Sequence, residues 1–125
     1  MNIGFQFVRT LLFLIFLAGP INVAAEGQFL SAIDDLPLMS GLQEVEGGVM
    51  VFDSSAGRIV EALSVGAVKK GAVLHYYSQT LPQLGWLETA PGQFSREGEM
   101  LRLEFPPVLA SSSQISVRFM LSPNP

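Results

Sequence analysis

Residues 67–86 read AVKKGAVLHYYSQTLPQLGW and contain the one clear helical pattern of the chain. The apolar residues of this pattern recur at spacings of one, three, four and three positions; they are Val73, Leu74, Tyr77, Leu81 and Leu84. At about 100° per residue they fall within a sector of about 100°, as in a helix that packs on one side. The pattern predicts a helix over Ala67–Leu84 with His75 on its exposed side.

The end of this segment predicts how the helix stops. Pro82 lacks the amide that would bond the Ser78 carbonyl, so regular helix is expected to kink or to end near Thr80. Gly85 stands where a left-handed residue commonly follows a helix. Trp86 is then placed to pack back on the last turn.

Strand patterns lie on both sides of the helix. Val49–Phe52 and Arg58–Val65 flank the turn formers of residues 53–57 and predict a β-hairpin. Three later segments also read as strands, the last two with strict apolar and polar alternation: Phe94–Arg96, Leu101–Phe105 and Ile115–Leu121. Alternation gives one apolar and one polar face, and the polar face is expected to pair Glu104 with Arg118.

This order, β-β-α-β-β-β, predicts an α+β fold with an antiparallel sheet of about five strands and one helix packed on one face. The predicted core consists of Val51, Ile59, Val73, Tyr77, Leu81, Leu84, Trp86, Phe94, Leu101, Leu103, Phe105, Ile115, Val117 and Phe119.

Residues 26–48 show neither a helical nor a strand period of apolar residues. They are predicted to form an extended N-terminal arm, which is followed by a single domain over residues 49–125. Pro37 favours an extended Leu36, and Gly41 permits a turn. The apolar side chains of this arm are expected to lie on the body of the domain; they are Leu36, Leu38, Met39 and Leu42.

Residues 1–25 have the pattern of a secretory signal peptide. Arg9 precedes the apolar run Leu11–Ala18, Gly19-Pro20 breaks the helix, and Val23-Ala24-Ala25 supplies small residues for cleavage after Ala25. The alternative, an uncleaved anchor, needs roughly 20 apolar residues, about twice what is present. The pattern therefore predicts export, with a mature chain that starts at Glu26 and has no stable membrane span.

Composition excludes several functional classes. The 125 residues include no cysteine, 49% are hydrophobic and 14% are charged, which rules out a disulfide-stapled miniprotein, a cysteine zinc site and a thiol oxidoreductase. Without Arg9 the mature chain has six Lys and Arg against eleven Asp and Glu, a net charge of −5. Such a balance argues against nucleic acid as a partner, because proteins bind its phosphates through clustered Lys and Arg.

The histidine, serine and aspartate residues of the chain form no recognisable catalytic set. His75 is the only histidine, and with no cysteine a metal site would need carboxylates for its other ligands. Asp53, Ser54 and Ser55 have the composition of a hairpin turn, and no G-x-S-x-G motif is present. No catalytic residue, metal or cofactor is therefore predicted.

The candidate surface for a ligand or partner combines aromatic residues, the histidine and two methionines of the polar sheet face. These residues are Tyr76, Trp86, His75, Met100 and Met120. Packing between helix and sheet is the alternative reading of Trp86.

Two motifs resemble a group of small exported proteobacterial domains of unknown function. Leu36-Pro37 with Gly41 gives Leu-Pro-x-x-x-Gly, and Tyr77–Trp86 gives Tyr-x-x-x-Leu-Pro-x-x-Gly-Trp. The resemblance implies a single α+β domain in the periplasm of a Gram-negative cell, and it carries no catalytic residues across.

The function expected from the sequence is that of a non-enzymatic interaction module of the cell envelope. It would bind another envelope protein through the open sheet face, a sheet edge or the N-terminal arm. The alternatives are a small-ligand carrier lined by Tyr76 and Trp86, and a hydrolase that depends on His75 or Asp53. The sequence leaves the oligomeric state open.

Overall fold

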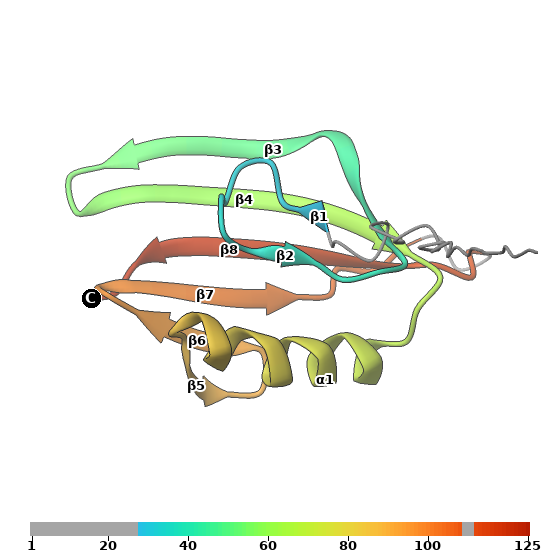
Figure 1. The fold of residues 1–125 in the computed structure, drawn as a ribbon. Coiled ribbons are helices and arrows are strands. Elements are labelled where there is room, and N and C mark those ends of the chain that lie inside the picture. Colours follow the sequence, from blue (N-terminus) through green and yellow to red (C-terminus); the bar gives the residue numbers. More distant parts are fainter. Residues whose placement is uncertain (1–27, 109–111) are drawn as a thin grey trace, which may run out of the picture.

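A computed structural model describes residues 28–108 and 112–125 and shows a twisted antiparallel sheet with a helix and a short hairpin on one face (Figure 1). In order across the sheet the strands are β3 (Leu42–Ser54), β4 (Gly57–Gly66), β8 (Ile115–Pro123), β7 (Glu99–Glu104), β6 (Gln93–Arg96) and β5 (Leu87–Ala90). The predicted α+β class is confirmed. The predicted signal peptide with its cleavage site at Ala25 lies outside the described residues, within which no helix is long and apolar enough to cross a membrane.

The main sheet has six strands rather than about five. The strand missed from the sequence is β5, whose residues Leu87, Glu88 and Thr89 are all exposed. It has no buried face to produce an alternating pattern. Its place is set by pairing with β6, where Leu87 lies opposite Ser95.

The helix is shorter than predicted at its start and ends as predicted. Helix α1 spans Lys70–Thr80, because Gly66 is still paired in the sheet and residues 67–69 carry the chain from the sheet to the helix layer. At Pro82 the chain tightens into the 3₁₀ turn η2 (Leu81–Leu84).

Gly85 then closes the helix with φ of 92°. Its amide donates to the Pro82 carbonyl, and the Trp86 amide donates to the Leu81 carbonyl, each at 3.1 Å. These two bonds form a Schellman motif. The glycine therefore has the local role that the sequence predicts, and the Trp86 amide completes the motif.

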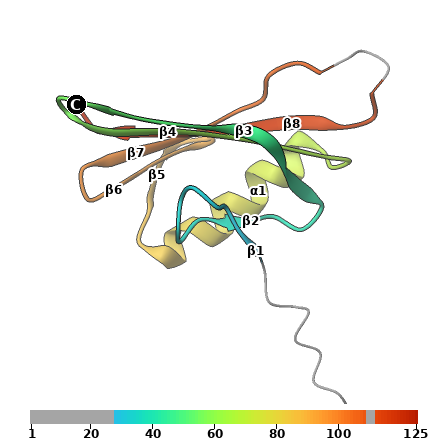
Figure 2. The same ribbon diagram turned by 90° about the horizontal axis from the view of Figure 1, so that it is seen from above.

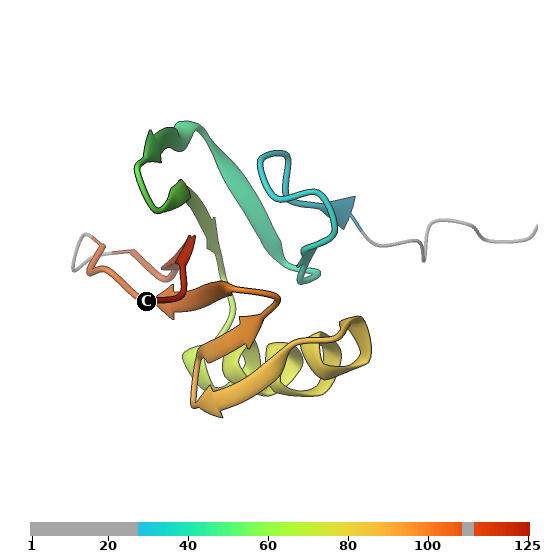
Figure 3. The ribbon, with the colours of Figure 1, turned by 90° about the vertical axis from the view of Figure 1, so that its left-hand side faces the viewer.

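The core lies between the sheet and two covering elements. Its buried side chains include Val60 and Ala62 of β4, Leu101 and Leu103 of β7, Val117 and Phe119 of β8, and Val73 and Tyr77 of α1. Figure 2 shows α1 and the N-terminal hairpin on the same side of the sheet. Figure 3 shows α1 against the β5–β7 half and the hairpin beside β3, so each covers a different part of this face.

The N-terminal hairpin consists of β1 (Gln28–Phe29) and β2 (Pro37–Leu38), which pair antiparallel. As predicted, this part of the chain lies on the body of the domain, and Leu36 and Leu38 are buried in the core. The predicted arm is too long, however, because β3 begins at Leu42 rather than at Val49.

Two predicted core residues are exposed, and one lies on the other face. The side chains of Val51 and Leu84 are 52% and 39% exposed. Val51 lies on the outer strand β3, whose hairpin with β4 extends past the covering layer of α1 and the N-terminal hairpin in Figure 1, and Leu84 is the last residue of η2. Ile59 adjoins the core residue Val60 along β4, so alternation turns it to the face away from α1.

Candidate interaction surface

The open face of the sheet is the face turned away from α1. It carries the residues of β4, β7 and β8 that alternate with core positions, among them Glu61, Leu63, Met100, Arg102, Glu104, Ser116, Arg118 and Met120. The predicted surface residues Met100 and Met120 are both found here and are half-buried.

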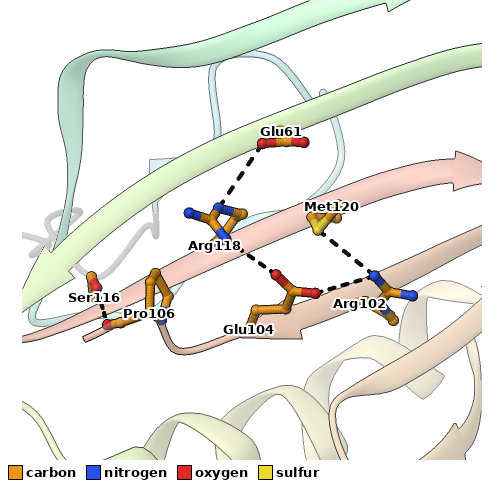
Figure 4. A network of polar contacts seen from close by, with 7 residues as sticks. All are labelled: Glu61, Arg102, Glu104, Pro106, Ser116, Arg118 and Met120. Carbon is orange, nitrogen blue, oxygen red and sulfur yellow. Dashed lines mark hydrogen bonds and ion pairs between the residues drawn. The ribbon is translucent and has the colours of Figure 1, made fainter.

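Two arginines and two glutamates form a row of ion pairs across this face (Figure 4). Arg118 Nη1 lies 3.2 Å from Glu104 Oε1, which confirms the predicted pair, and its Nε lies 3.9 Å from Glu61 Oε1. Arg102 Nη2 lies 3.1 Å from the other Glu104 oxygen and donates to Met120 Sδ at 3.9 Å. All four charged side chains are partly exposed, so each pair contributes about 0–1 kcal/mol. The row holds two positive and two negative charges and links β4, β8 and β7 across this face.

The outer strand β3 presents a continuous apolar segment at one edge of the sheet. Val49, Met50, Val51 and Phe52 are 37%, 55%, 52% and 48% exposed; we call these four residues the apolar edge segment. Val49 and Val51 pair with the buried Ala62 and Val60, so they lie on the core side of the sheet, and Met50 and Phe52 lie on the open face. Both faces of the edge are therefore apolar here.

Within the described residues no strand pairs with the outer side of this segment, so its backbone is available for pairing. The two-residue turn Ser55-Ala56 closes the hairpin, and pairs alternate between hydrogen-bonded and non-hydrogen-bonded classes from Ser54 and Gly57 onward. By this alternation Val49, Val51 and Asp53 are in non-hydrogen-bonded pairs with β4. Their amide and carbonyl groups point away from β4, toward the open side of the edge.

The N-terminal segment of the chain contacts the first half of β3 and covers it against strand addition. The second half has no such contact within the described residues. A bulge interrupts the pairing with β4 between Glu44 and Val49. Before the bulge, the Glu44 carboxylate accepts hydrogen bonds from the Ser31 amide and hydroxyl, both at 3.0 Å, so the N-terminal segment lies against this half. The apolar edge segment lies beyond that contact, between the bulge and the turn that joins β3 to β4.

The opposite edge of the sheet is a poor site for an added strand. Strand β5 has only four residues, and its pairing with β6 is irregular between Glu88 and Ala90. The Ser78 hydroxyl of α1 donates to Glu88 Oε1 at 2.8 Å, which ties this edge to the helix. Short and irregular edges are the usual protection against strand addition.

A surface pocket of about 200 Å³ lies where the bulge meets the open face, lined by Gly47, Gly48, Met50, Glu61, Ala62, Leu63 and Arg118. Gly47 has φ of 78°. A Cβ on Gly48 would lie 2.9 Å from the Val45 carbonyl oxygen and 3.1 Å from Leu63 Cβ. The two glycines permit the bulge and leave the pocket open.

The remaining candidates from the sequence lie elsewhere. Trp86 is buried on the core side, with the Arg96 guanidinium 4.3 Å from its ring centroid. Tyr76 packs edge-on against Tyr77 at 4.8 Å, and His75 is exposed on α1. These three residues are separated by the sheet from Met100 and Met120, so the five predicted surface residues do not form one site.

Arg96 has an electrostatic role beside Trp86. Its Nη1 lies 2.9 Å from Asp35 Oδ2 and donates to the Leu84 carbonyl, so it joins the N-terminal segment to the end of the helix. The hydrogen bond from Arg96 holds the pKa of Asp35 below its ordinary value. The contact therefore links the N-terminal segment, the end of the helix and β6.

The sequence did contain a signal for the apolar edge segment. Val49–Phe52 are four consecutive apolar residues without alternation, and such a strand has no polar face. In the part of the chain that the structure describes, no three His, Asp or Glu side chains are grouped so as to hold a metal ion. A scan against protein-family models and searches of curated proteins and solved structures gave no match.

Proposed function

We propose that this protein is a non-enzymatic interaction module that binds a partner protein by adding a partner strand to the edge of β3. The observation that carries the proposal is the apolar edge segment, Val49–Phe52, which is exposed on both faces and, within the described residues, has no strand paired along its outer side. Natural edge strands usually carry Lys, Pro or a bulge against such pairing, and none of these stands between Val49 and Ser54. Strand addition uses this kind of edge.

The alternatives from the sequence have less support. Ser54, one of the two serines beside Asp53 that could serve a hydrolase as nucleophile, donates to the Gly57 carbonyl and accepts from the Ala56 amide within the hairpin turn. A carrier lined by Trp86 would need that ring accessible, and it is 3% exposed. The pocket at the bulge is smaller than the roughly 300–1,000 Å³ typical of ligand sites.

The proposal includes the location of the protein. The pattern of residues 1–25 and the resemblance to small exported domains both support export to the periplasm of a Gram-negative cell, where the partner would be another envelope protein. Mass spectrometry of the protein from a periplasmic fraction should find Glu26 at the N-terminus. Recovery of an intact Met1 from the membrane fraction alone would contradict export.

Site-specific photo-cross-linking in producing cells tests the strand addition. A photo-reactive phenylalanine analogue at Val51 should give one discrete cross-linked species, and the same residue at the exposed His75 of α1 should not. Adding Val49→Pro to the Val51 probe should abolish the species, because proline removes an outward amide. Equal cross-linking from both positions, or none from Val51, would overturn the proposal.

A further inference from the structure

We infer that the partner strand is an apolar segment flanked by Lys or Arg, an inference that rests on the proposed strand addition to β3. The apolar edge segment specifies the centre of such a strand, and the charges at its two ends specify the flanks.

The ends of the apolar edge segment are acidic. β3 carries Glu44, Glu46 and Asp53 and no Lys or Arg along its 13 residues. Glu44 is engaged by Ser31, whereas Glu46 and Asp53 are exposed at the two ends of the segment. A cation placed opposite each of them would form a favourable cross-strand pair.

Arg58 does not remove this acidic character. It lies opposite Asp53 on β4, one strand in from the edge, and the two make no ion pair within 4.0 Å. An added strand would lie on the other side of Asp53. The carboxylate is therefore available to a partner.

A second copy of the chain fits this edge less well than a basic segment. Two-fold pairing centred on Val51 would place each Asp53 opposite Val49 of the other copy, so neither carboxylate would meet a cation. The mature chains would also approach with net charges of −5 each, which slows and weakens their association. Charge complementarity therefore favours a different, basic-flanked chain.

The centre of the partner strand should be apolar on both faces. Val49 and Val51 would contact its side chains on the core side, and Met50 and Phe52 would do so on the open face. On the open face the pocket beside Met50 lies next to the edge, where a partner side chain can enter it. Cross-strand apolar pairs of this kind stabilise added strands.

Labelled peptides with blocked termini test the inference by fluorescence anisotropy with the purified protein. The peptide KVIVIVK should bind about tenfold more tightly than EVIVIVE at low salt, because two favourable cross-strand charge pairs become two unfavourable ones. The ratio should fall as salt is raised. In the double variant Glu46→Gln with Asp53→Asn, the two peptides should differ by no more than about twofold.

Two controls separate this inference from the strand addition itself. Val51→Pro in the protein and proline at the centre of the peptide, KVIPIVK, should each abolish binding, and the second control leaves the fold of the protein untouched. Binding that is proline-sensitive but equal for the Lys and Glu peptides would overturn the basic-flank inference and leave strand addition standing. Binding unaffected by either proline would overturn strand addition at this edge. Failure of every peptide to bind would overturn the basic-flank inference, whereas the cross-linking experiment decides strand addition independently.

Discussion

At the scale of single residues, the Tyr77 hydroxyl is the polar link between the N-terminal hairpin and α1. It donates to the Pro37 carbonyl at 2.8 Å and accepts from the Met39 amide at 3.1 Å, and its ring packs edge-on against Phe119. Burial raises the pKa of this hydroxyl above its ordinary value, so it stays protonated and able to donate. The sequence predicts a buried Tyr77, but its partners lie about 40 residues away and no local pattern identifies them.

Tyr77→Phe removes both hydrogen bonds and leaves two backbone groups without this partner. We expect the free energy of unfolding to fall by about 2–3 kcal/mol, because unsatisfied buried groups cost about 1–3 kcal/mol each. Chemical denaturation measures the change. Tyr76→Phe is the matched control, since the neighbouring hydroxyl makes no hydrogen bond within the described residues, and it should change stability by less than about 0.5 kcal/mol. Equal losses in the two variants would contradict the role given to Tyr77.

At the scale of elements, local rules predicted the end of the helix but not the sixth strand. Pro82 and Gly85 act on the chain beside them, so their effects can be read from the sequence alone. Strand β5 depends on pairing with β6, and the exposure of Val51 depends on how far the covering layer reaches. Both features depend on tertiary contacts, which the spacing of apolar residues and the composition of the sequence do not reveal. The apolar edge segment belongs to the same class: its strand was predicted and its exposure was not.

Two glycines on the same helical unit are expected to respond to alanine with opposite signs. Gly85 has φ of 92°, so Gly85→Ala forces a left-handed alanine and should destabilise the protein by about 1–2 kcal/mol. Gly71 lies in α1, where an added Cβ meets nothing within 4 Å, and Gly71→Ala should stabilise by about 0.5–1 kcal/mol. Denaturation of both variants measures the difference. A neutral or stabilising Gly85→Ala would show that the Schellman motif does not determine the end of the helix.

At the scale of the whole molecule, the sheet is longer than the layer that covers it. α1 and the N-terminal hairpin bury the inner faces of β4, β7 and β8, and the projecting part of β3 stays outside them (Figure 1). Val51 and Val60 show the consequence, because they are cross-strand neighbours of one residue type with exposed fractions of 52% and 0%.

Val60→Ala should lower the free energy of unfolding by about 2 kcal/mol or more, through lost burial and the cavity left behind. Val51→Ala should cost less than about 0.5 kcal/mol in the isolated protein, as surface substitutions do. Adding a partner strand covers Val51, so the Val51→Ala variant should show its defect in partner binding rather than in unfolding. Equal losses of stability would mean that Val51 is already covered in the folded protein, and β3 would then have no surface left for a partner.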